Sequence, residues 1–131
     1  MSYDEVADAS AALSAGLKQM NIPRRASVVI ASKNCPEWLI TDFACAFGDF
    51  MSVGVHTSWP VAKLSAVLLD TNALAIVVSS AALPHIQQAL TAHQTKVKLV
   101  VVIDHSATGV IPSTTDATDA TDATDATDAT D

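Results

Sequence analysis

The chain has 131 residues and a formal net charge of −7, but six of its fourteen acidic residues lie in the last sixteen positions. Without those six, eight acidic residues stand against seven lysines and arginines, so the rest of the chain is nearly neutral. This balance excludes a nucleic-acid-binding face and a basic membrane-binding patch. The remaining length is enough for one domain with one core and too short for a multi-domain enzyme.

The two cysteines, Cys35 and Cys45, have no CxxC spacing and no neighbouring cluster of Cys and His. They predict free thiols in a reducing compartment rather than a disulfide framework or a zinc site. Asp4 and Glu5 stand where a signal peptide carries positive charge and then an apolar run, which argues against secretion. The longest apolar window, 39–55, is interrupted by two aspartates, so we expect no transmembrane segment and a cytoplasmic location.

A helix is expected at the start of the chain. Ser2 and Glu5 have the spacing of a capping box, in which each side chain accepts a hydrogen bond from the other residue's backbone N–H. Asn21, which tolerates a left-handed backbone, is expected to end the helix before Pro23 stops it. The apolar stripe at helical spacing consists of Val6, Leu13, Leu17 and Met20.

Four apolar runs without alternation follow, which is typical of strands covered on both faces. They begin 24 residues apart and cover 27–32, 51–56, 75–79 and 99–103. Three amphipathic stretches separate them, with Pro36, Pro60 and Pro84 near their starts, where a missing N–H costs little. The side chains expected to face the sheet are Leu39, Phe43, Phe47 and Phe50, then Val61, Leu64 and Leu68, then Leu83, Ile86 and Leu90.

Strands that alternate with helices through right-handed crossovers predict a parallel sheet with helices on its faces. The fold class is therefore α/β, with a parallel sheet of about four strands and covering helices. A solenoid of similar period is excluded because no segment shows an LxxLxL register. The composition changes at Ser106, and 115–131 repeats Thr-Asp-Ala without a large apolar residue. We therefore expect a globular part, 1–105, and a disordered low-complexity tail, 106–131.

The sequence contains few motifs that are typical of catalytic or ligand-binding sites. The four glycines are scattered, so there is no P-loop and no GxGxxG, and no GxSxG nucleophile elbow occurs. His85 and His93 are eight residues apart on one expected helix, about 12 Å along its axis, too far for one metal ion to bridge. His56 is the best single candidate because it ends an expected strand, where ligands of α/β sheets gather, although a loop or helix-capping role is more common there.

The remaining reactive or aromatic side chains favour packing roles. Trp38 and Trp59 are expected in the core or at its edge rather than stacked on a substrate. Cys45 is expected to be a small buried hydrophobe with no neighbour to lower its thiol pKa. We therefore assign no catalytic, cofactor-binding or metal-ligating residue in this chain.

Four segments together carry a resemblance. They are Ser-Tyr-Asp-Glu-Val at 2–6, Val-Val-Ile-Ala-Ser-Lys-Asn-Cys-Pro-Glu-Trp at 28–38, Asp-Phe-Ala-Cys at 42–45, and Gly-Val-His-Thr-Ser-Trp-Pro at 54–60. The run Asn-Cys-Pro-Glu-Trp, between an expected strand and helix, is the most specific of them. In this order they resemble the amino-terminal part of the adenylate-forming (AMP-binding) synthetases, especially the long-chain acyl-CoA synthetases, over residues 2–104.

The resemblance implies an activity for the full-length family. Its members use ATP and Mg²⁺ to convert a fatty acid to an acyl-adenylate and pyrophosphate, then transfer the acyl group to coenzyme A. It therefore implies a fragment of a fatty-acid:CoA ligase, with 1–105 as part of the amino-terminal subdomain. Fatty acid, ATP, Mg²⁺ and coenzyme A are implied for the full-length enzyme, cytoplasmic or peripheral to membranes, and no cofactor is implied for this chain.

Departures from the family pattern are of two kinds. Arg25-Ala26 stands where the family has a Gly-Asp pair before the first strand, and Asn21 stands where it has a glycine after the first helix. The second kind concerns missing segments: the phosphate loop, the adenine-binding strands, the hinge aspartate and the carboxy-terminal domain with its lysine. No active-site residue of the family can be carried onto this sequence, so the chain alone is expected to be inactive.

Two other interpretations stay open. A free-standing α/β binding or interaction module would need a ligand at the strand ends near 32–34, His56 and 79–80. An interaction protein would recruit a basic partner through the acidic tail, although one Asp in every three residues gives a low charge density. Uncovered sheet edges also predict self-association, with 28–30 and 100–103 as the segments most prone to it.

Overall fold

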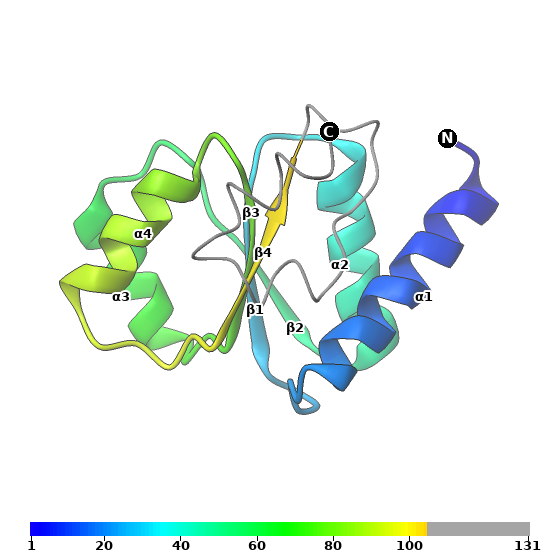
Figure 1. Cartoon of the computed structure of the whole chain (residues 1–131), viewed down its shortest axis with the longest axis horizontal. Coiled ribbons are helices and arrows are strands. Elements are labelled where there is room, and N and C mark those ends of the chain that lie inside the picture. The colour runs from blue at the N-terminus through cyan, green and yellow to red at the C-terminus, as the bar shows by residue number, and fades with distance from the viewer. Residues whose placement is uncertain (105–131) are drawn as a thin grey trace.

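A four-stranded parallel sheet lies between two pairs of helices (Figure 1). The computed structural model describes residues 1–104. In chain order the elements are α1 (Tyr3–Gln19), β1 (Ser27–Ala31), α2 (Pro36–Gly48), β2 (Met51–Gly54), α3 (Val61–Asp70), β3 (Ala75–Ser79), α4 (Leu83–Ala92) and β4 (Leu99–Ile103). The predicted α/β class is confirmed. The predicted disordered tail, 106–131, lies outside the described residues.

The strand order is β2-β1-β3-β4, and every neighbouring pair is parallel. The chain runs from β1 outward to β2 and then crosses back to β3 on the other side of β1, so the strand order reverses between β1 and β3. All four strands begin at the predicted positions. β1 and β2 end earlier than predicted, at Ala31 and Gly54, because the chain there turns into the loops that lead to α2 and α3.

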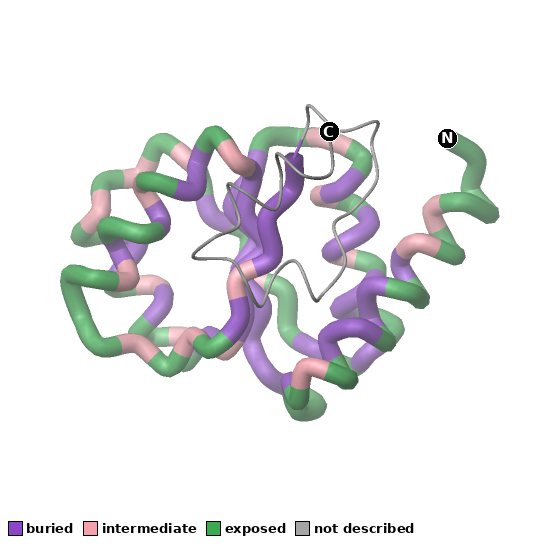
Figure 2. Tube along the Cα trace, in the orientation of Figure 1, coloured by how far each residue is buried: buried purple, intermediate pink, exposed green. Residues whose placement is uncertain are grey.

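Alternate side chains of the strands enter two separate cores, one on each face of the sheet. Val28 and Val77 belong to the core under α1 and α2, whereas Val29 and Val78 belong to the core under α3 and α4. None of these four side chains is more than 1% exposed. Figure 2 shows the buried residues along the strands and on the inner sides of the helices. Covering on both faces explains why the strand sequences are apolar without alternation.

The predicted capping box begins α1. The Ser2 hydroxyl oxygen accepts the Glu5 N–H at 3.2 Å, and Glu5 Oε1 accepts the Ser2 N–H at 2.9 Å. The bond from the Ser2 backbone, helped by the Ser2 side chain, holds the pKa of the Glu5 carboxyl below its ordinary value because it stabilises the ionised form. Asn21 follows the helix with a φ of 64°, the left-handed conformation that was predicted for it.

α2 turns a different face to the sheet from the one predicted. Leu39, Phe43 and Phe47 are 40% to 56% exposed, and of the predicted stripe only Phe50 is buried. The buried face of α2 instead consists of Glu37, Ile40, Thr41, Ala44, Cys45 and Gly48. This face packs against α1 as well as the sheet, and smaller side chains let the two helices approach closely. The close approach of α1 and α2 therefore decides which face of α2 is buried, and the large aromatic side chains are left on the exposed face.

α3 and α4 present their predicted stripes. Leu64 and Leu68 of α3 and Ile86 of α4 are no more than 2% exposed. The buried Ser65 hydroxyl donates a hydrogen bond to the Ala89 carbonyl oxygen at 3.0 Å, so one polar contact joins the two helices inside this core. The pair therefore forms one layer over its face of the sheet.

The strands at the edges of the sheet are only partly those that the sequence predicted. β1 pairs with β2 on one side and β3 on the other, so the expectation that 28–30 is an exposed, association-prone segment is wrong. Among the described strands the outer ones are β2 and β4, and 100–103 lies in β4. Met51 and Ser52 of β2 are exposed, whereas β4 is largely buried. The more exposed edge is therefore β2, next to the uncovered side of α2.

Candidate functional site

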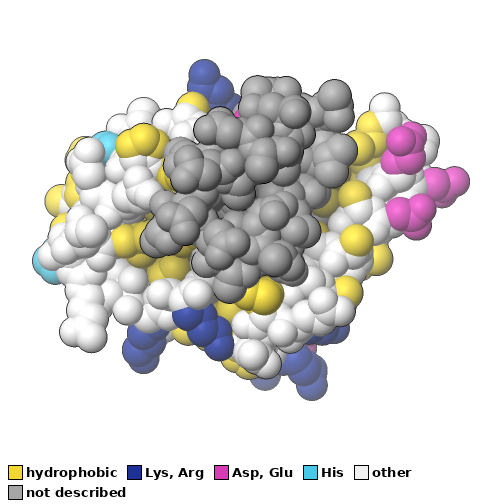
Figure 3. Space-filling model, viewed as in Figure 1, with side chains coloured by type: hydrophobic (Ala, Val, Ile, Leu, Met, Phe, Trp, Pro, Cys, Tyr) yellow, Lys and Arg dark blue, Asp and Glu magenta, His cyan; other side chains and the backbone are white. Residues whose placement is uncertain are grey.

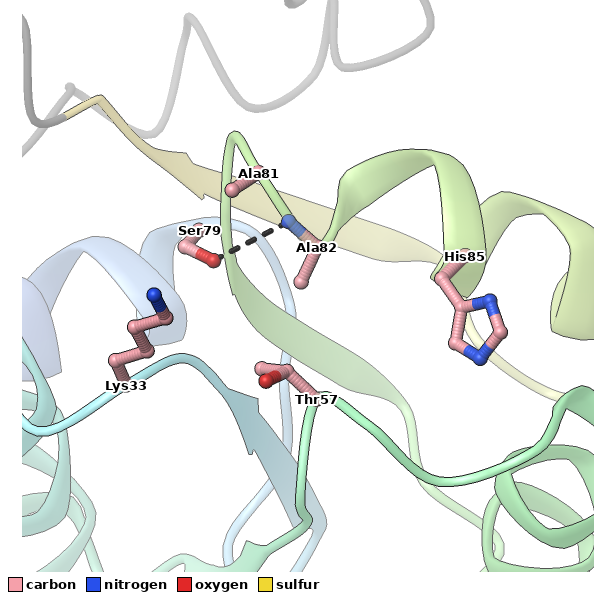
Figure 4. Close-up of a pocket in the computed structure, with 6 residues that line it drawn as sticks. All are labelled: Lys33, Thr57, Ser79, Ala81, Ala82 and His85. Carbon is pink, nitrogen blue, oxygen red and sulfur yellow. Dashed lines mark hydrogen bonds between the residues drawn. The ribbon is translucent and has the colours of Figure 1, made fainter.

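A cavity of about 300 Å³ opens at the carboxyl ends of the strands, where the strand order reverses between β1 and β3. Its described lining residues come from the loops after β1 and β2, from the end of β3 and from the start of α4 (Figure 4). They are Lys33, Thr57, Ser79, Ala81, Ala82 and His85. Ligands in open parallel sheets bind at this position, so this cavity is the candidate site.

The loop between β1 and α2 places Lys33 at the rim of the cavity. The Ser32 hydroxyl donates to the Lys33 carbonyl oxygen at 2.9 Å and lies 3.6 Å from Cys35 Sγ, which holds this short loop. The Lys33 side chain is exposed, and within residues 1–104 no carboxylate forms an ion pair with it. Lys33 therefore brings to the cavity a positive charge that no carboxylate within residues 1–104 pairs with.

Ser79 ends β3 and is only 5% exposed. The Ala82 N–H donates to the Ser79 carbonyl oxygen at 3.0 Å and to its hydroxyl oxygen at 3.3 Å, a contact drawn in Figure 4. The Ser80 N–H donates to the Ile103 carbonyl oxygen at 2.9 Å, which ties the loop to β4. α4 then begins without a capping side chain, since its N-cap residue is Ala82. Because Ala82 lines the cavity, the positive end of the α4 dipole lies there.

On the far side of the cavity, His85 joins α4 to the loop that follows β2. Its Nε2 lies 2.6 Å from the Trp59 carbonyl oxygen, and because a carbonyl only accepts, Nε2 carries the hydrogen. The Trp59 ring meets the His56 ring edge to face at 5.2 Å, and Lys63 Nζ lies 4.1 Å from the Trp59 ring centre. His85 and Trp59 therefore hold α4 against the loop that follows β2.

Of the strand-end residues predicted from the sequence, some line the cavity and others do not. Lys33 and Ser79, from the predicted ranges 32–34 and 79–80, line the same cavity, but His56 is absent from its described lining and pairs with Trp59 instead. Sequence reasoning missed Thr57 and His85. Their sequence positions were a weak indication of a place at the strand ends. Thr57 directly follows His56, and His85 lies in the first turn of the helix after β3.

The two tryptophans have the packing roles predicted for them. Trp59 is partly buried against the core under α3 and α4. Trp38 lies against β2, because a β-carbon on Gly54 would be 3.3 Å from Trp38 Cζ2. Neither ring is among the described lining residues of the cavity.

Cys45 is buried in the core, as predicted, and burial raises the pKa of its thiol to about 12, with the charge of Asp42 adding to the effect. Such a thiol is a poor nucleophile. Cys35 is partly exposed, and both cysteines are free. Within residues 1–104 there is no group of three or more His, Cys, Asp or Glu side chains that could hold a metal ion.

Charge is unevenly placed on the surface. The acidic side chains of the first turn of α1, Asp4 and Glu5, gather at one end of the molecule (Figure 3). No acidic side chain is among the described lining residues of the cavity. Lys33 is the one lysine, arginine, aspartate or glutamate among the described lining residues.

The sequence model of the AMP-binding enzymes matches residues 1–131. The chain belongs to the AMP-binding enzyme family. Over 103 residues this AMP-binding chain is 32% identical to long chain acyl-CoA synthetase 6, peroxisomal, of Arabidopsis thaliana. The aligned part is 79% of this chain and 15% of the Arabidopsis protein, so the chain spans a small share of that relative's length. The resemblance drawn from the four sequence segments is confirmed.

Solved structures of adenylate-forming enzymes share the fold. A long-chain-fatty-acid-CoA ligase from Archaeoglobus fulgidus superposes with a TM-score of 0.75 at 20% identity, over 91% of this chain and 23% of that one. An anthranilate CoA ligase in complex with anthranoyl-AMP gives 0.74 at 20% identity, over 79% and 20%. A luciferase-like enzyme from the mealworm Zophobas morio gives 0.73 at 19% identity, over 78% and 24%. At these identities the likeness establishes the fold alone.

Proposed function

We propose that this chain forms a sheet of an ATP-dependent long-chain fatty-acid:CoA ligase and serves there as scaffold. The observation that carries the proposal is the 32% identity over 103 residues with a long chain acyl-CoA synthetase. In the complete ligase, ATP and a fatty acid form an acyl-adenylate and pyrophosphate, and coenzyme A then takes the acyl group. Fatty acid, ATP and coenzyme A are therefore proposed partners of the complete enzyme.

The described residues supply packing rather than the chemistry of adenylation. Adenylation needs fixed donors for the charge that develops on the transferred group, and carboxylates that hold Mg²⁺ beside the phosphates. The described cavity lining has one cation, Lys33, and no carboxylate, and the glycines of the chain are scattered. These residues do not fit ATP with Mg²⁺, which supports the proposal that the chain forms no acyl-adenylate alone.

Two experiments test this proposal. The purified chain, given palmitate, ATP, Mg²⁺ and labelled pyrophosphate, should exchange no label into ATP, while the Arabidopsis synthetase provides the positive control. In a chimera, this chain's residues 1–104 replace the matching segment of the Arabidopsis synthetase, and palmitoyl-CoA formation should persist. Exchange by the isolated chain would contradict inactivity, and a folded but inactive chimera would contradict the scaffold role.

A cytoplasmic location is proposed on the basis of the two free thiols, Cys35 and Cys45. None of the helices formed within residues 1–104 is long and apolar enough to cross a membrane. The Arabidopsis relative is named as peroxisomal, so a fluorescent fusion imaged beside a peroxisomal marker is the decisive measurement. A diffuse cytoplasmic signal is expected, and co-localisation with the marker would contradict it.

We also propose that two copies of the chain associate through the β2 edge and the adjoining side of α2. Leu39, Phe43, Phe47 and Met51 are all at least 40% exposed there. No described strand pairs with the outer side of β2, and its sequence, Met-Ser-Val-Gly, contains no lysine or proline to block pairing. A second copy matches this surface because it offers both an unpaired strand and an apolar helix face.

A further inference from the structure

We propose that a hollow at the amino ends of the strands binds a phosphate group, either as inorganic phosphate or as a small phosphate monoester. The hollow has a volume of about 350 Å³. Its described lining comes from the segment before β1, the start of β2, the loop between α3 and β3, and the loop before β4. It lies at the opposite end of the sheet from the candidate site, so the inference goes beyond the scaffold role and does not depend on it.

Positive charge gathers at this hollow. Its described lining contains three cations, Arg24, Arg25 and Lys96, and no acidic residue. Arg24 is already paired, because its Nε and Nη2 donate to Asp49 Oδ2 at 2.9 and 2.7 Å. No carboxylate within residues 1–104 forms an ion pair with Arg25 or Lys96. These two charges match the nearly two negative charges that a phosphate monoester carries at pH 7.

The charged surface is visible from outside the molecule. Figure 3 shows Lys and Arg side chains along the lower edge, and Figure 1 shows the starts of the strands on that same side. The acidic side chains of the first turn of α1 lie away from it, at the far end of that helix. An anion that approaches the amino ends of the strands therefore meets a predominantly positive surface.

Arg25 has the side chain best suited to a phosphate group. Its backbone N–H donates to the Asp49 carbonyl oxygen at 2.6 Å, which fixes the chain beside the hollow. The planar guanidinium group can donate to two oxygens of one phosphate at once. The φ of Arg25 is 66°, a conformation that favours glycine, and strained residues of this kind are often found where the side chain has a function.

Ser27 adds a hydroxyl group to the lining. The residue is only 3% exposed, and its hydroxyl forms no hydrogen bond with another residue of 1–104. Among these residues no fully enclosed side-chain oxygen or nitrogen lacks a partner, so the Ser27 oxygen is accessible from the hollow that the residue lines. This hydroxyl can donate to an anion without breaking another bond. The side-chain amide of Asn72 also lines the hollow and has no partner among the described residues.

The carboxyl ends of α1 and α3 lie on this side of the sheet and oppose anion binding, because each is equivalent to about half a negative charge. Other groups already offset them. Lys98 Nζ donates to the Asn21 carbonyl oxygen, just after α1, at 2.7 Å. In α3 the Val67 carbonyl oxygen accepts the Thr71 N–H at 3.0 Å and the Thr71 hydroxyl at 2.7 Å. The two full positive charges of the lining therefore outweigh the helix ends.

The arrangement of the donors favours phosphate over a carboxylate. Arg25 and Ser27 precede or begin β1, Asn72 follows α3, and Lys96 precedes β4, so the donors come from three separate segments. A tetrahedral phosphate has three oxygens to accept from different directions, whereas a planar carboxylate has two. The lining also includes the apolar residue Leu74, which leaves a place for the body of a small ester.

The test is an amide-resolved NMR titration of the full 131-residue chain with inorganic phosphate and with glycerol 3-phosphate, at constant ionic strength. Saturable shifts are expected for the amides of Arg25, Ser27 and Lys96, with a dissociation constant on the order of 1 mM. Succinate, which carries its two charges on planar carboxylates, should bind at least about tenfold more weakly. Tighter binding of glycerol 3-phosphate would identify a monoester as the ligand, and equal binding would identify the phosphate group alone.

Two pairs of variants locate the site. Lys96→Gln should weaken phosphate binding about tenfold, while Lys63→Gln, the same charge change at an exposed position in the first turn of α3, should leave it unchanged. Lys63 is about 12 Å along the helix axis from Thr71 at the hollow, so salt screens its charge. Ser27→Ala should weaken binding about threefold, whereas Ser58→Ala, in the loop after β2, should not. Well-dispersed spectra of each variant confirm that it is folded.

Three results would overturn the proposal. The first is the absence of saturable phosphate shifts at the three amides. The second is succinate binding as tightly as phosphate, which would show that the surface recognises negative charge of any kind, including that of an acidic peptide. The third is an equal phosphate affinity in Lys96→Gln and Lys63→Gln.

Discussion

Gly48 and Ser14 meet where α2 crosses α1, and a β-carbon added at Gly48 would lie 2.6 Å from the Ser14 hydroxyl oxygen. It would also lie 2.7 Å from Cδ2 of Phe50. The two helices can approach this closely only because one of them has no side chain at the contact. The larger residues of α2, such as Phe43 and Phe47, stay on its outer side for the same reason.

Replacement of this glycine should destabilise the chain. In Gly48→Ala, overpacking against Ser14 and Phe50 outweighs the better helix propensity of alanine, and the free energy of unfolding should fall by about 2 kcal/mol. Gly54→Ala is the matched control, because its β-carbon would approach only Trp38 Cζ2, at 3.3 Å. Urea denaturation measures both, and a Gly48→Ala chain as stable as the original would contradict the packing account.

Arg25 has a φ of 66°, a conformation in which a β-carbon is strained. Arg25→Gly should raise the free energy of unfolding by about 0.5 to 1 kcal/mol, since relief of strain exceeds the added entropy of the unfolded chain. The Arg25 N–H, which donates to the Asp49 carbonyl oxygen at 2.6 Å, is kept in the variant.

The neighbouring Arg24→Gly makes the same charge change but removes two hydrogen bonds to Asp49 Oδ2, so it should not stabilise. Thermal unfolding of the two variants distinguishes them. Equal effects at both positions would show that charge, and not backbone strain, is responsible.

The raised pKa of Cys45 predicts a loss of stability at high pH. Burial raises the thiol pKa from 9.0 to about 12, so the folded chain keeps a proton that the unfolded chain releases. The contribution is fully present below pH 9 and is lost as pH rises towards 12, by up to about 1.4 kcal/mol per pH unit. Urea denaturation between pH 8 and 10.5 should show a shallower decline for Cys45→Ala than for Cys35→Ala. Parallel pH profiles would contradict this.

Self-association through β2 and α2 should depend on the exposed aromatic residues. Phe47 is 56% exposed, so Phe47→Lys should leave the fold intact while weakening the dimer at least about tenfold. Leu69→Lys, at a 43% exposed position on α3, should leave the dimer unchanged. Sedimentation equilibrium provides the measurement. An original chain that stays monomeric at every concentration would refute the proposed contact.

We propose that 1–105 is a domain separate from 106–131. Deletion of 106–131 should shift the melting temperature by no more than about 2 °C, because the Thr-Asp-Ala repeats at 115–131 offer no large apolar side chain to bury and 106–114 contains only two, Val110 and Ile111. The deletion also removes six aspartates, so a full-length chain with these changed to asparagine controls for charge. A large fall in melting temperature for the deletion alone would show that the segment supports the fold.

Local signals were enough to predict most of the elements. The start of α1 follows from the Ser2 and Glu5 pair, and the four strand starts follow from apolar runs at 24-residue spacing. The left-handed Asn21 follows from its place between a helix and a proline. In each case the residues that decide the conformation are near one another in the sequence, so the pattern is readable without knowledge of the fold.

Tertiary structure alone decided the buried face of α2, the interior place of β1 and the composition of the cavity. α2 is oriented by the approach of Gly48 to Ser14, 34 positions earlier in the sequence. β1 becomes an interior strand because β2 and β3 pair on opposite sides of it. Lys33 and Ser79 line one cavity for the same reason, since β1 and β3 are neighbours in the sheet. These relationships depend on which distant segments pack together, a choice made by the free energy of the whole fold rather than by any local sequence pattern.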